Sequence, residues 1–182
     1  MGKVEDNKLL LEKYPWLLPS NKWSGKWITE CMGEDGDEGY WPGDPFQHPE
    51  YDYSYTELDA MPRGWRKAFG LQMCEELNQE ITTWSEATQR QFRIMQIKEK
   101  YGSLRFYTNF STTKLDEIIN KYERLSERLC IDCGQPAKWI SKGWICPWCD
   151  DCCKEDRKRN PDNYMPIKEW FDEEDEVSDE VE

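Results

Sequence analysis

The sequence predicts an α+β fold, in which a small domain of helices and a β-hairpin carries a C-terminal zinc-ribbon-like knuckle. Two stretches repeat apolar residues at helical spacing, one stretch alternates along a strand, and six of the eight cysteines lie between Cys130 and Cys153. A chain of 182 residues that is 37% hydrophobic and 34% charged can bury one modest core. We expect that core within residues 1–129 and the knuckle within residues 130–160.

Three segments are predicted to be helices. A short helix over residues 5–14 ends at Pro15. A longer helix spans residues 64–80, and a third begins at Thr113, where Asp116 follows three residues later, and continues to the first knuckle cysteine. The apolar faces of the two longer helices consist of Trp65, Ala68, Phe69, Met73, Cys74 and Leu77, and of Leu115, Ile118, Ile119, Tyr122, Leu125 and Leu129.

Residues 91–98 and 104–110 have strand character. The second segment alternates, because Leu104, Phe106, Thr108 and Phe110 share one face. The connecting sequence Lys-Tyr-Gly-Ser at 100–103 supplies turn residues, so that the two strands are expected to pair as a hairpin.

The cysteine spacing predicts one structural Zn²⁺ ion. Cys130 and Cys133 form a Cys-x-x-Cys pair that is followed by a glycine, which allows the chain to fold back under the two thiolates. The second pair is either Cys146 with Cys149 or Cys149 with Cys152. Both options have the same spacing, and spacing alone does not decide between them.

The compartment favours metal over disulfides. Charged and polar residues follow Met1 without an apolar signal segment, so a reducing cytoplasm is expected. No apolar run approaches the length of a membrane span, and no membrane partner is expected. Cys31, Cys74 and Cys153 are interpreted as ordinary isolated thiols.

Two acidic blocks dominate the net charge of −13. Residues 27–62 contain ten acidic residues, no Lys or Arg, and many Gly and Pro residues, which predicts a long irregular loop. Its aromatic residues suggest that it packs on the domain or on a partner. Residues 169–182 contain nine acidic residues and predict a disordered tail, which is either solubilising or an arm for a basic partner.

Several motifs together carry a resemblance to a known family. They are Ile-Lys-Glu-Lys-Tyr-Gly-Ser-Leu-Arg-Phe-Tyr at 97–107, Cys-Ile-Asp-Cys-Gly at 130–134, Gly-Trp-Ile at 143–145 and Cys-Asp-Asp-Cys at 149–152, with Met-Pro-Arg-Gly-Trp-Arg at 61–66 upstream. With these motifs the chain resembles a family of small uncharacterised proteins common in phages and prophages.

The resemblance implies a ligand set and a biological context. In that family the segment after Gly-Trp-Ile ends in Cys-Asp-x-Cys or Cys-Asp-x-His, which implies that Cys149 and Cys152 form the second pair. The implied ligands are therefore Cys130, Cys133, Cys149 and Cys152, with Cys146 as a spare thiol. The family supplies a phage context but no activity.

Enzymatic activity is not expected. Four thiolates close the zinc coordination sphere and leave no position for a substrate or water. His48 is the only histidine. It could pair with Cys31 as a catalytic Cys-His pair, but we favour its interpretation as a residue of the surface loop. The carboxylates of the acidic loop lack the ordered spacing of a Mg²⁺ or Ca²⁺ site.

Two functions remain as hypotheses. The first is a phage accessory protein that binds a host protein in the host cytoplasm, as an acidic inhibitor or decoy of a defence or nucleic-acid-handling protein. The alternative is a nucleic-acid-binding zinc protein whose contacts come from the basic cluster Lys154, Arg157, Lys158 and Arg159. A second basic face with rings for stacking would comprise Arg90, Arg93, Lys98, Lys100, Arg105, Tyr101 and Tyr107.

Overall fold

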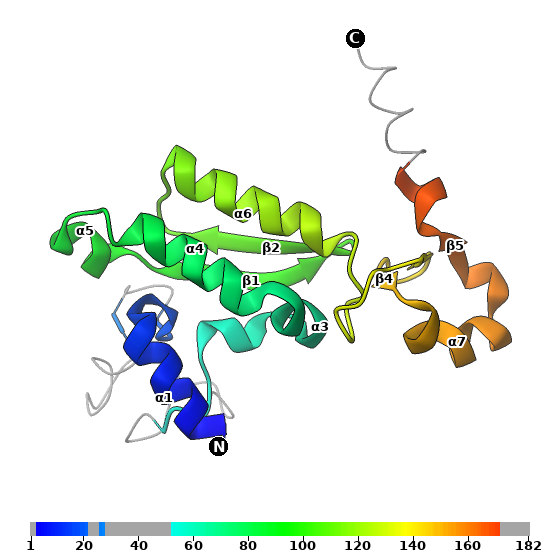
Figure 1. The fold of residues 1–182 in the computed structure, drawn as a ribbon, viewed down its shortest axis with the longest axis horizontal. Helices are drawn as coiled ribbons and strands as arrows, with labels where there is room; N and C mark the ends of the chain where they lie inside the picture. Colours follow the sequence, from blue (N-terminus) through cyan, green and yellow to red (C-terminus); the bar gives the residue numbers. More distant parts are fainter. Residues whose placement is uncertain (1–2, 22–25, 28–51, 172–182) are drawn as a thin grey trace, which may run out of the picture.

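The computed structural model describes residues 3–21, 26–27 and 52–171, and it confirms the α+β class (Figure 1). The elements before the knuckle are α1 (Lys3–Lys13), η1 (Pro15–Leu17), η3 (Glu57–Ala60), α3 (Arg63–Trp65), the π-helical turn η4 (Arg66–Gly70), α4 (Leu71–Ile81), α5 (Glu86–Gln91), β1 (Ile94–Lys100), β2 (Ser103–Thr108) and α6 (Thr113–Ser126). The later elements are β3 (Trp139–Ser141), β4 (Pro147–Trp148), α7 (Asp150–Arg159), η5 (Pro161–Asn163) and β5 (Tyr164–Pro166).

The predicted hairpin forms, with β1 antiparallel to β2 and Ile97 opposite Phe106. The turn residues Tyr101 and Gly102 both have positive φ, 53° and 79°, as the tightest hairpin turns require. The first strand starts three residues later than predicted. Residues 86–91 instead form helix α5, whose N-cap Ser85 accepts a hydrogen bond from the Thr88 amide.

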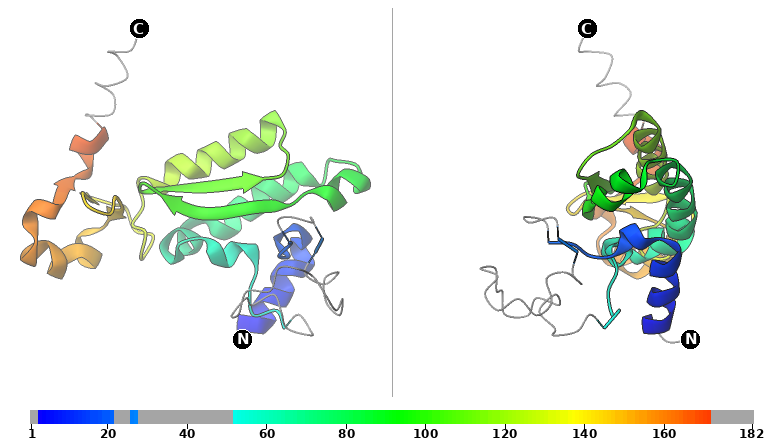
Figure 2. Two further views of the ribbon diagram at one scale, coloured as in Figure 1. Left: turned by 180° about the vertical axis from the view of Figure 1, so that it is seen from behind. Right: turned by 90° about the vertical axis from the view of Figure 1, so that its left-hand side faces the viewer.

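One face of the hairpin carries the core. Ile97, Leu104 and Phe106 are buried there, and α4 and α6 lie side by side, with α6 against β2. Most of each predicted apolar face enters this core, whereas Ala68 and Leu125 stay exposed. Phe69 stacks on Tyr122 with ring centroids 5.3 Å apart. In the view from behind, no helix of the described residues covers the opposite face of the two strands (Figure 2).

Helix α6 also completes the outer edge of β2. The Leu104 amide donates to Ser126 Oγ at 2.7 Å, and the Phe106 amide donates to Glu123 Oε1 at 3.0 Å. Unpaired amides along an edge strand invite pairing with another chain. Two side chains of one helix therefore satisfy groups that a third strand would otherwise occupy.

The end of the predicted acidic loop belongs to the core, which corrects part of that prediction. Leu58 is buried, Thr56 and Asp59 form a capping box around η3, and η3 packs on β1. Asp59 also forms an ion pair with Arg66. The expected loop over residues 27–62 therefore ends before η3, because a hydrophobic residue and a helix start interrupt its polar composition. Residues 28–51, with Cys31 and His48, and residues 172–182 of the tail lie outside the described part.

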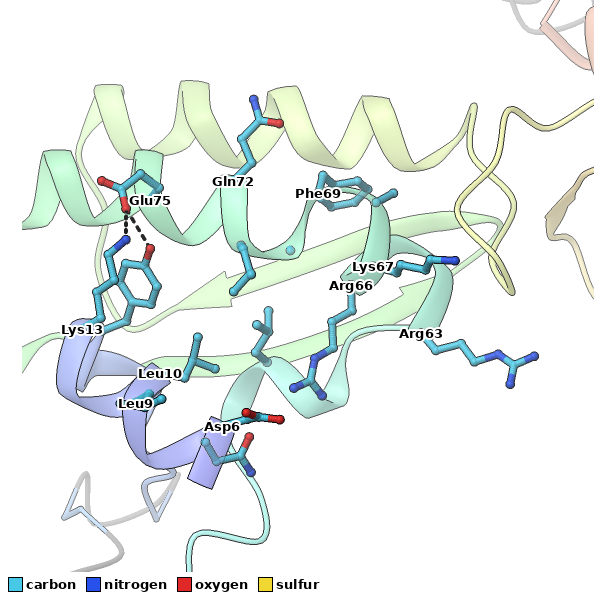
Figure 3. Close-up of a pocket in the computed structure, with 16 residues that line it drawn as sticks. Asp6, Leu9, Leu10, Lys13, Arg63, Arg66, Lys67, Phe69, Gln72 and Glu75 are labelled. Carbon is cyan, nitrogen blue, oxygen red and sulfur yellow. Dashed lines mark hydrogen bonds and ion pairs between the residues drawn. The ribbon is translucent and has the colours of Figure 1, made fainter. Parts of the chain in front are cut away.

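A groove of about 860 Å³ separates α1 from η4 and the start of α4 (Figure 3). Glu75 closes one end, where it accepts hydrogen bonds from Tyr14 at 2.8 Å and pairs with Lys13 at 2.7 Å. Leu9 and Leu71 on its rim are 52% and 61% exposed. The groove is open, and its cations Arg63 and Arg66 pair with Asp132 and Asp59, which do not line it.

Helix α3 fixes the start of the knuckle to the core. The Gly64 amide donates to the Ile131 carbonyl at 2.9 Å, and the buried Trp65 indole donates to the Leu129 carbonyl at 2.9 Å. Gly64 and Gly134 face each other so closely that a Cβ on Gly134 would lie 2.4 Å from the Gly64 carbonyl oxygen. The cysteine turn therefore rests directly on the helix that leads into α4.

This contact predicts that Gly64→Ala destabilises the protein. The new Cβ would lie 2.4 Å from the Cys130 carbonyl oxygen, and backbone atoms on both sides would have to move. We expect a loss of about 2 kcal/mol of unfolding free energy in urea denaturation, the usual cost of overpacking. Gly143→Ala is the control, because its Cβ would meet Asn163 Oδ1 at an ordinary 3.5 Å. Equal losses in the two variants would contradict the close-packed joint.

Candidate metal centre

Four cysteine side chains converge on one point of the knuckle. The Sγ atoms of Cys130, Cys133, Cys149 and Cys152 all lie within 4.8 Å of one another. Cys130 and Cys149 are buried, whereas Cys133 and Cys152 reach towards solvent. The structure thus brings together the four residues that the family resemblance implies, and this cluster is suited to hold a metal ion.

The first pair sits in a tight turn after α6. The Cys130 amide donates to the Gln135 carbonyl at 2.8 Å, and the Gly134 amide donates to the Cys130 carbonyl at 2.9 Å. Gly134 has φ of 78°, a conformation that residues with a Cβ rarely adopt. The glycine predicted to let the chain fold back under the thiolates does so here.

The second pair is set by the start of helix α7. Cys149 is the N-cap, and its Sγ accepts a hydrogen bond from the Cys152 amide at 3.5 Å. One turn of helix brings Cys152 beside Cys149, and Cys133 Sγ lies 3.5 Å from Cys149 Sγ. A thiolate at a helix N-terminus is favoured by the helix dipole.

The local environment shifts the pKa values of the two thiols of the second pair in opposite directions. Burial acts to raise the pKa of Cys149, but hydrogen bonds from the Cys152 backbone and from the neighbouring thiols outweigh it and bring the pKa below its ordinary value. Burial, together with hydrogen bonds to neighbouring thiols, raises the pKa of Cys152. Cys149 is therefore the thiol of the second pair that ionises most easily.

Cys146 stands apart from the cluster. It is buried, and its amide donates a hydrogen bond to Ser141 Oγ at 3.1 Å. Burial raises the pKa of its thiol to about 12. Cys153 is buried next to the cluster and its thiol donates to the Cys149 carbonyl at 3.2 Å. Cys74 lies in the core, where burial raises its pKa to about 12.

A small sheet supports the second pair, and the sequence did not predict it. Strands β4, β3 and β5 are hydrogen-bonded in that order. Asp150, next to Cys149, accepts hydrogen bonds from Trp139 Nε1 at 2.7 Å and from Lys138 Nζ at 2.6 Å. The Arg157 guanidinium stacks on the Trp139 ring at 3.7 Å. These contacts fix the N-terminus of α7 and hence both of its cysteines.

The first pair is anchored from the other side. Arg63 Nε donates to Asp132 Oδ1 at 2.7 Å, inside the Cys-x-x-Cys turn. On the knuckle side of the hairpin, a Cβ on Gly102 would lie 3.3 Å from Ile145 Cγ2, so the hairpin turn touches the β3–β4 loop. Both halves of the cysteine cluster are therefore mounted on elements of the core.

No protein-family model matches the chain, and no curated protein or solved structure is significantly similar to it. The resemblance to a phage family therefore stays a prediction. None of the described helices is long and apolar enough to cross a membrane.

The geometry predicts different outcomes for two serine substitutions. Cys152→Ser removes a member of the cluster and should lower the bound metal markedly, because three thiolates hold an ion less tightly than four. Cys146→Ser should leave the metal content unchanged. The measurement is elemental analysis of both purified variants after dialysis against a weak chelator. Loss of metal from Cys146→Ser with retention in Cys152→Ser would contradict this ligand set.

Proposed function

We propose that Cys130, Cys133, Cys149 and Cys152 bind one structural Zn²⁺ ion. The observation that supports this is the convergence of the four Sγ atoms within 4.8 Å. Zn–S bonds of about 2.3 Å in a tetrahedron place neighbouring sulfurs about 3.8 Å apart. The separation of 3.5 Å between Cys133 and Cys149 is close to that value.

The ion's role in this proposal is structural. It links the turn after α6 to the N-terminus of α7, two segments that are otherwise joined through short strands. Four protein thiolates fill a tetrahedral site and leave no position for substrate. The binding free energy of the ion would therefore contribute to the folding of the knuckle.

For the whole chain we propose a non-enzymatic phage accessory protein that binds a host protein in the host cytoplasm, as an acidic inhibitor or decoy. The acidic composition of residues 28–51 and 172–182 supports a basic partner surface, by charge complementarity. The closed cysteine cluster supports a role without catalysis.

The alternative, nucleic-acid binding by the basic cluster after the site, has less support. Arg157 pairs with Asp150 at 3.4 Å, Lys158 with Glu155 at 3.0 Å and Arg159 with Asp156 at 4.0 Å. Each of these carboxylates lies on α7 itself, so the helix presents paired charges rather than a basic stripe. Lys154 is the one member of the cluster without a carboxylate partner among the described residues.

The identity and role of the metal can be tested together. Elemental analysis should find one zinc per chain, and a colourless protein would exclude iron, which also binds four thiolates. After chelation, hydrogen exchange should accelerate over residues 130–153, at the end of α6 and at the Gly64 amide, which bonds to Ile131. Amides of α4 and the centre of the hairpin should stay protected. A chelated protein with unchanged exchange over 130–153 would contradict the structural role.

The partner can be tested by capture from nuclease-treated bacterial lysate. The matched variants replace residues 28–51 by a short Gly-Ser linker or end the chain at residue 171, which leaves η3 and the buried Leu58 in place. We expect a nuclease-resistant protein partner that weakens or disappears when the acidic segments are removed. Capture of the same partner by a variant that lacks both segments would refute the acidic mechanism.

A further inference from the structure

We propose that the exposed end of the hairpin binds single-stranded nucleic acid by stacking of bases. The surface consists of Lys98, Lys100, Tyr101, Tyr107 and Trp144, and is called the aromatic–basic face below. This inference goes beyond the proposed protein partner, because it assigns a different ligand to a different surface. It also differs from the basic cluster on α7.

Three large rings of this face are exposed, whereas the other aromatic residues in the described part of the chain are buried or partly buried. Trp144 is 77% exposed, Tyr101 71% and Tyr107 43%, whereas Trp65, Tyr122 and Phe92 are fully buried. Exposed apolar rings that pack on nothing add little to stability. The neighbouring Gly102 packs against Ile145, and Leu104 and Phe106 are buried in the core. The three exposed rings make no comparable contribution to packing.

Two of the rings lie where the hairpin turn meets the knuckle. Tyr101 lies in the hairpin turn, and Trp144 lies in the loop whose next residue, Ile145, touches Gly102. The Trp144 carbonyl accepts a hydrogen bond from Ser141 Oγ, and Ser141 Oγ also accepts one from the Trp148 indole at 3.2 Å. Tyr107 pairs with Gln96, four positions from the turn, or about 13 Å along the strand. The backbone at Tyr101 and Trp144 is therefore positioned by contacts between the hairpin turn and the knuckle.

Each tyrosine has a lysine beside it. Lys98 Nζ lies 5.6 Å from the centre of the Tyr107 ring, and Lys100 Nζ lies 5.4 Å from the centre of the Tyr101 ring. Neither lysine has a carboxylate partner among the described residues, unlike three of the four cations of the α7 cluster. The nearby carboxylate of Glu99 is directed at the turn, where it accepts from the Gly102 amide at 2.7 Å.

Rings that alternate with unpaired cations match the chemistry of a single strand. Bases supply flat faces for stacking, and the phosphates between them meet the ammonium groups. A duplex would present phosphates only, since its base faces are covered by neighbouring base pairs. The net charge of −13 opposes long-range attraction, so binding is expected at short range and should be sensitive to salt.

The test uses the full zinc-loaded chain and fluorescein-labelled oligo-dT and oligo-U of about 12 nucleotides, within the length range of single-strand sites. Anisotropy is recorded at about 50 and 200 mM salt, a range over which phosphate contacts weaken strongly. Trp144→Ala and Tyr101→Asn should each weaken binding about 5- to 150-fold, the effect of losing one stacked base. Asn tolerates the positive φ of the turn, so the second variant keeps the hairpin.

Matched controls remove an exposed apolar group and two cations elsewhere. Leu71→Ala changes a 61% exposed residue in the groove of Figure 3, away from the hairpin turn, and should bind like the wild type. The double variant K98A/K100A should lower the slope of log affinity against log salt by about 1.4, because two phosphate contacts are lost. The double variant K154A/K158A on α7 should not.

Several results would overturn the proposal. They are absence of oligonucleotide binding by the wild type at low salt, an equal loss in Leu71→Ala, or equally tight binding of a duplex of the same length. Capture of a protein partner from lysate tests the proposed function independently, so a failure of oligonucleotide binding can be told apart from a failure of the proposed function. If Tyr101→Asn and Trp144→Ala lose the protein partner but never affect an oligonucleotide, the face is a protein interface and nucleic-acid binding is refuted.

Discussion

The backbone joint between α3 and the cysteine turn supports both halves of the molecule. At this joint the Gly64 amide bonds to the Ile131 carbonyl, and Gly64 and Gly134 approach so closely that neither has room for a side chain. Trp65 continues into η4 and α4, whereas Ile131 lies beside Cys130. Hydrogen bonds and close packing thus join the knuckle to the core. The buried Trp65, which bonds to the Leu129 carbonyl, helps to position the turn that carries Cys130 and Cys133. The proposed ion would stabilise a turn that the core already shapes.

The sequence predicted the long elements because each buries a periodic apolar face. Most of the predicted apolar residues before and within α4 and along α6 enter the core as expected. Gly102 supplies a positive φ that glycine favours in the hairpin turn, and Tyr101 adopts one too, which is uncommon for a residue with a Cβ. Helix α5 was missed, since none of its residues is buried and no period arises. Strands β3, β4 and β5 have two or three residues each, too few to show alternation.

The cysteine pairing shows how far spacing can go. Cys146 and Cys152 are equally distant from Cys149 along the chain, so that only a local conformation distinguishes them. A helix begins at Cys149, and Asp150 and Asp151 in its first turn are the residues that a helix N-terminus favours. These two aspartates are visible in the sequence, but they favour Cys152 over Cys146 as the partner of Cys149 only once a helix is known to begin there. The supporting contacts of Asp150 come from residues eleven and twelve positions away and have no sequence signature.

Charged side chains have different partners on the hairpin than elsewhere in the described structure. Ion pairs occupy most cations near the knuckle and the core, such as Arg66 with Asp59 and Lys121 with Glu76. The lysines of the hairpin instead lie beside tyrosine rings.

The edge of β2 is covered by side chains from the last turns of α6. Were the last turn of α6 to unwind, Ser126 would withdraw from the Leu104 amide and expose a strand edge that other copies could extend. Helix α6 therefore covers a strand edge that would otherwise be open to pairing with another chain.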